Sequence, residues 1–262
     1  MATPPQFFDA YPVFTWEEFV SALGEERTEE TLHTQIKYYL KTGKIAQVKN
    51  GLYFVKSPRG KQSIPDKYLV GAKIAPDGVL GYHSAFELLG YDHSVSSKIY
   101  VLTSTRVRSC RFKTLTYETV PCPAKLRDQA QCQFGTVQVE RQGIKVTTTG
   151  KERTIVDALD RPEYAGGIEE SVRCIEKVPY IDFELMYEYL HLRKKKILFA
   201  KAGFLLEQFR SEWVVGDAWL QSLEEHLPES PAYFLPNETG ILIDRWNLIV
   251  PEYIIRKSWE EL

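Results

Sequence analysis

The sequence predicts an α+β fold in two parts: a small N-terminal part, residues 1–62, and a larger mixed α/β part, residues 63–262. The chain has 262 residues, a length typical of about two domains. Hydrophobic residues make up 44% of it and charged residues 26%, as in globular proteins with enough apolar material for a core. The stretch KSPRGKQSIPD, residues 56–66, is rich in Ser, Pro, Gly and Lys, which is typical of a linker between the parts.

The N-terminal part begins with a helix, a short strand and another helix. Prolines at the start of PPQFFDAY, residues 4–11, are tolerated in a first helical turn, so a short helix is expected there. The stretch PVF that follows predicts a strand. Thr15 and Glu18 then form the T-x-x-E capping box, which begins a helix that continues to about Leu23.

A further helix and a hairpin complete the N-terminal part. In TEETLHTQIKYYLKTG, which Gly43 ends, apolar residues recur at a helical interval: Leu32, Ile36 and Leu40. The pair Asn50–Gly51 lies between the short apolar runs Ile45–Val48 and Leu52–Val55, and it predicts a hairpin turn because both residues adopt positive φ at little cost. This order of elements is that of a winged helix-turn-helix. In that architecture the last helix enters the major groove of DNA and the hairpin, the wing, contacts phosphates.

The charged residues of this region are unevenly distributed. Residues 1–30 contain seven acidic residues and one arginine, whereas residues 31–65 contain seven basic residues and no acidic one. The net charge of −2 predicts no nucleic-acid partner, but salt confines each charge contact to about 8–10 Å, so a local basic face matters more. The candidate DNA-binding residues lie on the hairpin and on the polar face of the preceding helix: Thr34, Lys37, Tyr38, Lys41, Lys44, Lys49 and Asn50. Taken singly, each lysine also fits an ordinary solvated face.

The second part contains helical and strand patterns without an internal repeat. Helices are expected at 65–76, ended by Pro76, at 83–89, stopped by Gly90, and at 151–160, 167–177, 182–192, 195–209 and 217–227. Strands are expected at 98–104 and 112–120, in a hairpin around Gln142–Gly143, and in a closing pair at 232–235 and 241–250. Thr149 and Glu152 form a second capping box at the start of the helix 151–160.

Membrane and cysteine patterns favour a cytoplasmic protein. No apolar run reaches the roughly 18–20 residues of a membrane span, and the N-terminus lacks a basic segment followed by an apolar one. We therefore expect no membrane partner. The four cysteines form no C-x-x-C pair, and their spacing predicts buried or idle thiols, neither a zinc site nor a disulfide framework: Cys110, Cys122, Cys132 and Cys174.

The sequence contains none of the common catalytic motifs. It lacks a glycine-rich phosphate loop, a dinucleotide fingerprint, a nucleophile elbow and H-E-x-x-H, so we expect no enzyme, no cofactor and no metal. His83 and His93 have no evident third ligand, and His83 is interpreted as a helix-start or packing residue. Asp157 and Asp160, three residues apart on a helix, are expected to make surface or capping contacts with nearby arginines.

Two other functions stay open at this point. A metal-dependent nuclease that carries a DNA-binding head would depend on carboxylates such as Asp157 or Glu170. An interaction scaffold would use the basic hairpin to bind an acidic protein. The four-base run Arg193–Lys196 is typical of a solvated helix end, although RNA or an acidic partner could also bind it.

Three stretches resemble the AbiEi family, the antitoxin and transcriptional-repressor components of bacterial type IV toxin–antitoxin systems. They are FTWEEF with GKIAQVKNGLYFV, the helix PDKYLVGAKIAPDGVLGYHSAFELLG, and TTTGKERTIVDALDRPEYAGGIEE. The resemblance extends from about residue 10 to about residue 255, and its most specific stretch is Thr149 to Gly167.

The resemblance implies a function and a set of partners. An N-terminal winged helix would bind inverted repeats upstream of its own operon, with a possible dimer on the DNA, and a C-terminal domain would act as the antitoxin. The functional partner implied is a nucleotidyltransferase-like toxin, without a stable complex. Basic residues around the signature become candidates for an antitoxin surface: Lys151, Arg153 and Arg161. A competing interpretation is that Arg153 pairs with Asp157 one helical turn later and only holds the helix in place.

Overall fold

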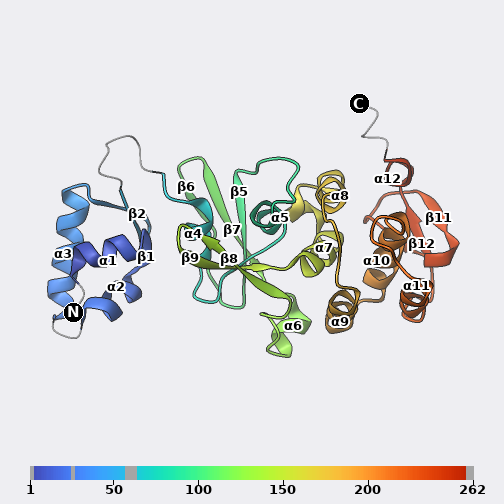
Figure 1. Ribbon diagram of the computed structural model, residues 1–262, viewed down its shortest axis with the longest axis horizontal. Helices are drawn as coiled ribbons and strands as arrows, with labels where there is room; N and C mark the ends of the chain where they lie inside the picture. Colours follow the sequence, from blue (N-terminus) through green and yellow to red (C-terminus); the bar gives the residue numbers. More distant parts are fainter. Residues whose placement is uncertain (1–2, 25–26, 57–63, 258–262) are drawn as a thin grey trace. The chain divides into compact units, whose positions relative to one another are not determined.

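The structure, a computed structural model, describes residues 3–24, 27–56 and 64–257 (Figure 1). It contains both helices and sheets, which confirms a mixed α+β protein. The chain falls into two compact units. The first unit consists of residues 1–80, 97–120 and 138–147, and the second of residues 81–96, 121–137 and 148–262. The predicted boundary after residue 62 lies outside the described residues.

The first unit begins with the expected series of elements, which we call the N-terminal segment, residues 3–56. Its elements are α1 (Pro4–Ala10), β1 (Val13–Thr15), α2 (Trp16–Leu23), α3 (Glu29–Lys41), β2 (Ile45–Lys49) and β3 (Leu52–Val55). The predicted capping box is present, since the Glu18 amide donates to the Thr15 hydroxyl at 3.2 Å and the Thr15 amide donates to the Glu18 carboxylate at 2.8 Å. The strands form an antiparallel sheet in the order β1-β3-β2, and Gly51 in the hairpin turn has φ +76°.

An aromatic core holds the N-terminal segment together. Buried side chains from its helices and strands form one cluster: Phe7, Phe8, Phe14, Phe19, Leu23, Leu32, Ile36, Ile45 and Tyr53. Phe7 lies edge-on to both Phe14 and Phe19, with ring centroids 5.2 and 5.3 Å apart, an arrangement that adds to the free energy of apolar burial. The inward positions of Leu32 and Ile36 fix which face α3 turns outward.

The rest of the first unit is built around a six-stranded sheet in the order β6-β7-β5-β4-β9-β8. Its strands are β4 (Val79–Leu80), β5 (Lys98–Thr103), β6 (Cys110–Phe112), β7 (Leu115–Pro121), β8 (Thr136–Arg141) and β9 (Ile144–Thr149). The strand predicted at 112–120 is present as β7, but it begins at Leu115. Lys113 takes φ +54° and turns the chain, so Phe112 belongs to the preceding strand β6.

One helix of the first unit is shorter than predicted. Helix α4 (Lys67–Ala72) ends four residues before Pro76. Its start is fixed by Asp66, whose carboxylate accepts hydrogen bonds from the amides of Tyr68 and Leu69 at 2.9 and 3.2 Å. Such a side-chain cap satisfies amides that have no partner within the helix.

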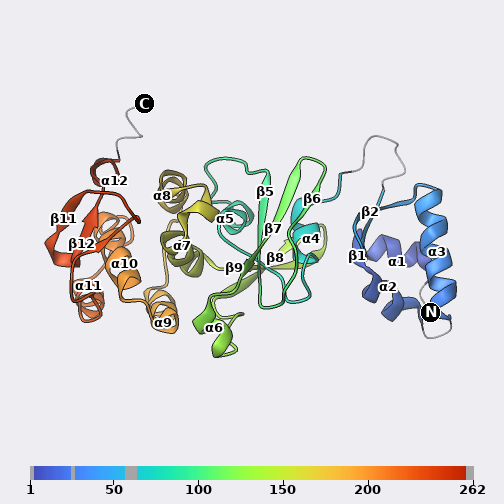
Figure 2. The same ribbon diagram turned by 180° about the vertical axis from the view of Figure 1, so that it is seen from behind.

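The second unit is mostly helical. Its elements are α5 (His83–Leu89), α6 (Ala124–Asp128), α7 (Lys151–Asp160), η2 (Pro162–Ala165), α8 (Ile168–Glu176), α9 (Phe183–Arg193), α10 (Lys196–Gln208), α11 (Asp217–Glu224), β10 (Ala232–Tyr233), β11 (Ile241–Ile243), η3 (Asp244–Trp246), β12 (Leu248–Val250) and α12 (Glu252–Arg256). Helix α7 contacts α5, α8, α9 and α10 (Figure 2). Every residue of α7 from Glu152 to Leu159 is buried. Helix α7 is the central helix of this unit.

The start of α7 differs from the prediction. Gly150 is the N-cap residue and contributes no side-chain hydrogen bond, so the second capping box is wrong. The Thr149 hydroxyl lies 2.7 Å from the Thr154 hydroxyl instead. The Glu152 carboxylate accepts a hydrogen bond from the Asp182 amide at 2.8 Å, at the residue that caps α9.

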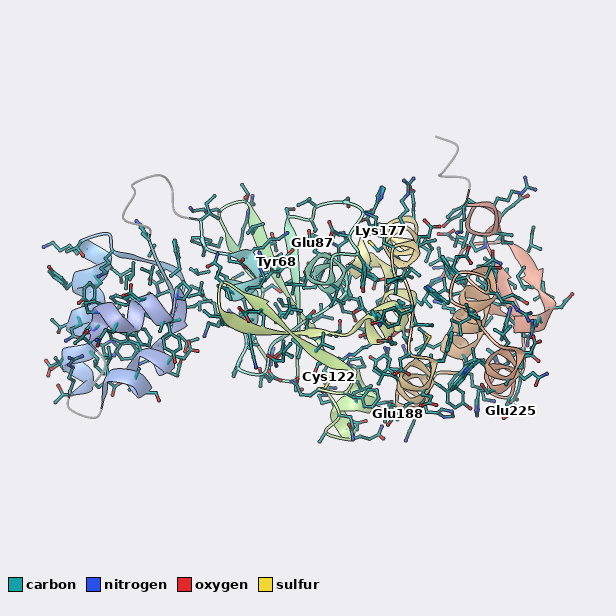
Figure 3. The ribbon with its side chains drawn as sticks, viewed as in Figure 1. Tyr68, Glu87, Cys122, Lys177, Glu188 and Glu225 are labelled. Carbon is teal, nitrogen blue, oxygen red and sulfur yellow. A yellow bond between two sulfur atoms is a disulfide. The ribbon has the colours of Figure 1, made fainter. Side chains whose placement is uncertain are left out.

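Two of the four cysteines form a disulfide. Cys122, labelled in Figure 3, is bonded to Cys132, and their Cα atoms are 6.2 Å apart. Cys110 and Cys174 are free. The expectation of four unpaired thiols is therefore wrong. The turn of chain that contains α6 brings the two cysteines together, although their spacing resembles no standard motif. Among the described residues, no helix has both the length and the apolar character to span a membrane.

Candidate functional site

The outward face of α3 carries four of the predicted DNA-binding residues. Leu32 is fully buried and Ile36 is 3% exposed, while the candidates on this helix are exposed: Thr34, Lys37, Tyr38 and Lys41. Tyr38 is 62% exposed, which is unusual for a large aromatic side chain. The predicted orientation of the helix is confirmed. Two ammonium groups and a phenol are thus available to a ligand on this face.

Of the three candidate DNA-binding residues in the hairpin region, two are exposed and the third is hydrogen-bonded within the protein. Asn50 at the turn is exposed, and so is Lys44, whose ammonium lies 5.4 Å from the ring centre of Phe8. Lys49 differs from the prediction. Its ammonium donates a hydrogen bond to the carbonyl of Ile74 at 2.7 Å, so it is turned toward the protein and is only half-exposed. The local sequence gives no sign of this partner, which lies 25 residues away.

The predicted antitoxin surface is only partly on the surface. Arg153 is 1% exposed, and it donates hydrogen bonds to the carbonyls of Cys132 and Phe134 at 2.8 and 2.6 Å. The surface position predicted for Arg153 is therefore wrong, because α7 is central to its unit. Lys151 is half-buried with its ammonium 3.6 Å from the ring centre of Tyr180, and Arg161 is also half-buried.

A buried ion network surrounds Asp157. Its carboxylate accepts hydrogen bonds from the Tyr189 hydroxyl at 2.7 Å, from Arg153 at 3.4 Å and from Arg193. The pairing of Arg153 with Asp157 is confirmed, but Asp157 lies in the core and not on the surface. These ion pairs and this burial leave the carboxylate poorly placed for the metal chemistry of a nuclease.

The end of α9 also differs from the prediction. Arg193 is 3% exposed and bridges Asp157 and Asp160, so the expectation of a solvated helix end is wrong for this residue. Burial opposes the ionised form of Asp160, but the charges of Arg193 and Lys195 outweigh it and lower the pKa of the Asp160 carboxyl. The sequence shows the acidic residues of α7 and the basic residues at the end of α9, but it does not show that these residues face each other.

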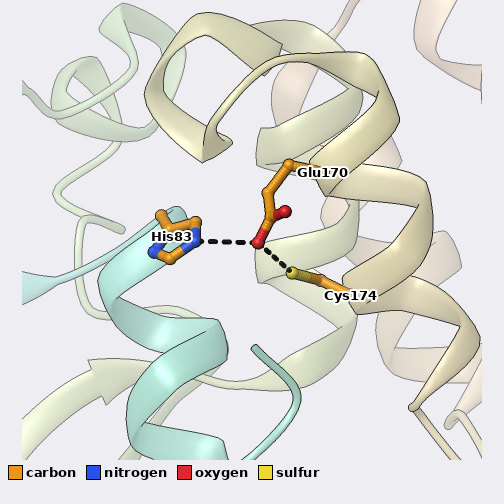
Figure 4. A group of neighbouring side chains, drawn as sticks. All are labelled: His83, Glu170 and Cys174. Atoms are coloured by element: carbon orange, nitrogen blue, oxygen red, sulfur yellow. Dashed lines mark hydrogen bonds and ion pairs between the residues drawn. The ribbon is translucent and has the colours of Figure 1, made fainter. Parts of the chain in front are cut away.

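A second polar cluster lies between α5 and α8. His83 Nε2 lies 3.1 Å from Glu170 Oε1, and the Cys174 thiol donates to the same oxygen at 3.6 Å (Figure 4). That oxygen also accepts hydrogen bonds from the amide and the hydroxyl of Ser94, both at 2.9 Å. His83 is 2% exposed and Cys174 is buried.

The pKa shifts of this cluster follow from its burial and its hydrogen bonds. Burial alone would raise the pKa of the Glu170 carboxyl, but hydrogen bonds from Ser94 and His83 lower it below its usual range. Burial raises the pKa of the Cys174 thiol to about 12, against a backbone hydrogen bond from His93. The sequence interpretation of His83 missed both partners. The only local signal was the spacing of four between Glu170 and Cys174, which places them on one helix face.

Comparison with known proteins gives a fold relationship. The sequence matches no protein-family model, and it matches no curated protein. Among solved structures, the crystal structure of the RV2827C protein from Mycobacterium tuberculosis is similar, with a TM-score of 0.63 at 17% sequence identity. The match covers 97% of this chain and 91% of that chain. At this identity the similarity shows a shared fold and does not extend to activity.

Proposed function

We propose that the protein is a DNA-binding transcriptional autorepressor and the antitoxin of a type IV toxin–antitoxin system. The observation that carries the DNA-binding half is the orientation of α3. This helix buries Leu32 and Ile36 and exposes Lys37, Tyr38 and Lys41 on the opposite face. The proposal assigns no catalytic step to the chain, and it places the protein in the cytoplasm with its operator.

In this proposal the N-terminal segment acts as a winged helix-turn-helix. Helix α3 enters the major groove, where Thr34 and Tyr38 meet base edges or sugars, and Lys37 and Lys41 meet phosphates. The hairpin of β2 and β3 is the wing and contributes Lys44 and Asn50. Each neutralised phosphate releases counterions, so the affinity falls as salt rises. Inverted repeats in the operator would require two copies of the segment, hence a dimer on DNA.

The antitoxin half of the proposal rests on the resemblance of the Thr149–Gly167 stretch to the AbiEi family. Of the three basic candidates, Lys151 and Arg161 are retained because both are partly exposed. They would oppose a nucleotidyltransferase-like toxin without forming a stable complex with it. This half is tested by producing the protein in bacteria together with the product of an adjacent nucleotidyltransferase-like gene. Growth that the toxin stops should then be restored. If the double variant Lys151→Glu, Arg161→Glu rescues growth as well as the unaltered protein, these two residues have no antitoxin role.

The DNA-binding half is tested with DNA from upstream of the protein's own gene. The affinity is measured by fluorescence anisotropy over a range of salt concentrations, for the unaltered protein and for Lys37→Glu combined with Lys41→Glu. Loss of two phosphate contacts should reduce the slope of log affinity against log salt by about 2. Lys125→Glu, an exposed lysine on α6, is the matched control and should behave like the unaltered protein. Equal slopes for all three proteins would contradict the proposal.

A further inference from the structure

Three side chains with metal-binding atoms converge in the second unit. His83 begins α5, whereas Glu170 and Cys174 lie one turn apart on α8. One atom from each side chain, the His83 nitrogen, a Glu170 oxygen and the Cys174 sulfur, lies within 4.8 Å of the other two (Figure 4). Two of these separations, 3.1 Å from nitrogen to oxygen and 3.6 Å from sulfur to oxygen, approach the roughly 3.3–3.6 Å between neighbouring ligands of a tetrahedral zinc ion.

We propose that His83 Nε2, Glu170 Oε1 and Cys174 Sγ bind a zinc ion that joins the start of α5 to α8. A nitrogen, a carboxylate oxygen and a thiolate sulfur form a ligand set typical of zinc, whereas magnesium and calcium prefer oxygen ligands alone. The thiolate and the carboxylate together carry two negative charges, so they neutralise the ion in a buried place. On binding, the Cys174 thiol releases its proton to solvent, and water completes the coordination.

The second ring nitrogen of His83 supports this assignment. Within the described part of the chain, Nδ1 of His83 is buried and has no hydrogen-bond partner. It lies 3.9 Å from Glu87 Oε1, and that side chain is 4% exposed. Zinc on Nε2 leaves the ring proton on Nδ1, directed toward the Glu87 carboxylate. Metal-bound histidines usually direct their second N–H to such a carboxylate, and a small shift of the ring completes the bond.

The loop between α5 and β5 orients Glu170 directly and His83 through Glu87. Ser94 donates its amide and its hydroxyl to the ligating oxygen of Glu170, both at 2.9 Å, and these bonds favour the ionised carboxylate. The Ser96 amide donates to Glu87 Oε1 at 2.9 Å and positions the carboxylate beside His83. Groups that orient Glu170 and His83 are therefore present around these two ligands.

The competing interpretation is a hydrogen-bonded cluster that binds no ion, in which His83 lies between the carboxylates of Glu87 and Glu170. The two interpretations differ in the role of Cys174. Zinc requires its sulfur as a ligand, whereas the hydrogen-bonded cluster uses its thiol only as a weak donor to Glu170, a role that a hydroxyl can fill. Substitution by serine therefore separates them, because serine keeps the shape of the side chain and removes the thiolate.

The experiment uses the untagged full-length protein after removal of metal with a chelator. Zinc is titrated in competition with a chromophoric chelator, and cobalt is added separately to detect sulfur-to-cobalt charge-transfer absorption. We expect one ion per chain and an absorption band that Cys174→Ser abolishes. Glu87→Gln should weaken zinc binding by about 10- to 100-fold. Cys110→Ser, the other free cysteine, is the matched control and should change neither result.

Two results would overturn the proposal. One is the absence of stoichiometric zinc binding by the unaltered protein, and the other is a cobalt band that persists in Cys174→Ser. Circular dichroism checks that each variant is folded. If Cys174→Ser does not fold, the unaltered protein and Glu87→Gln still decide, because an unaltered affinity in Glu87→Gln would contradict the His83 geometry.

Discussion

The hydroxyl of Tyr189 on α9 donates a hydrogen bond to Asp157 Oδ1 on α7 at 2.7 Å, and both side chains are buried. The same carboxylate meets the guanidinium groups of Arg153 and Arg193. Two cations in the core are therefore compensated in large part by one anion, and Asp160 supplies the second negative charge at Arg193. The cost of desolvating these groups makes the network sensitive to the loss of any partner.

Asp157→Asn should destabilise the protein by about 3–5 kcal/mol, because it leaves buried guanidinium charge uncompensated. Urea unfolding followed by circular dichroism measures the change. Glu229→Gln is the control, since Glu229 pairs with Lys196 at the surface and its loss should leave the unfolding midpoint unchanged. Equal midpoints for Asp157→Asn and the unaltered protein would show that the network is not what holds α7 to α9.

Gly203→Ala should destabilise the protein by about 1–3 kcal/mol through overpacking. A Cβ at this position of α10 would overlap the indole ring of Trp246, which is fully buried and hydrogen-bonded to Glu207 at 2.7 Å. Thermal unfolding measures the effect. Gly216→Ala is the matched control because a Cβ there meets no atom within 4 Å, and its cost should stay below about 1 kcal/mol. A similar cost for both variants would contradict the overpacking argument.

The stability of the protein should depend on pH through Lys201. Burial lowers the pKa of its ammonium to about 8 from the ordinary 10.5, although it donates a hydrogen bond to the Leu159 carbonyl at 2.7 Å. Between these two pH values the unfolded chain binds more protons than the folded one, so stability from this group rises with pH.

Lys201→Met removes this titration and provides the test. The unaltered protein should gain stability relative to the variant as the pH increases from about 8 to 10.5. Urea unfolding of both proteins at several pH values measures the difference, and the buried tyrosines contribute equally to both. A difference that does not change with pH would show that Lys201 keeps its ordinary pKa in the folded state.

The disulfide should account for part of the stability of the second unit. Closing a loop of this length contributes roughly 2–3 kcal/mol in the chain-entropy model. Cys122→Ser with Cys132→Ser should lose that amount in chemical unfolding, whereas Cys110→Ser should not. In denaturant without reductant, thiol titration should find two free thiols per chain, and four after reduction. Four thiols before reduction would show that the bond does not form in the purified protein.

Much of the fold could be predicted from local patterns. The bounds of α5 and α7 match the predicted 83–89 and 151–160, because Gly90 stops the first and Gly150 and the end of the apolar pattern delimit the second. The break between β6 and β7 could not be predicted, since it depends on a positive φ at Lys113, a residue type that rarely adopts it. The false capping box shows the same limit. Thr149 and Glu152 have the right spacing, but each has a better partner elsewhere.

The polar clusters were harder to predict because their members are distant in sequence. Glu170 lies 87 residues after His83, and Arg193 lies 36 residues after Asp157. The pairing of Arg153 with Asp157 could be predicted, because these residues lie one helical turn apart on α7. The exposed face of α3 was also predictable. Leu32, Ile36 and Leu40 recur every four residues, so they lie on one side of the helix and fix which side faces outward.

The bond between Cys122 and Cys132 makes the intervening chain, with α6, a covalently closed ring. A protease that cuts within the exposed residues 127–131 would therefore leave both fragments attached to each other. The nicked protein would migrate as one species in a denaturing gel without reductant and separate into two only after thiol treatment. Backbone cleavage at this place and separation of the two fragments are thus two separate events, and the separation requires reduction of the disulfide.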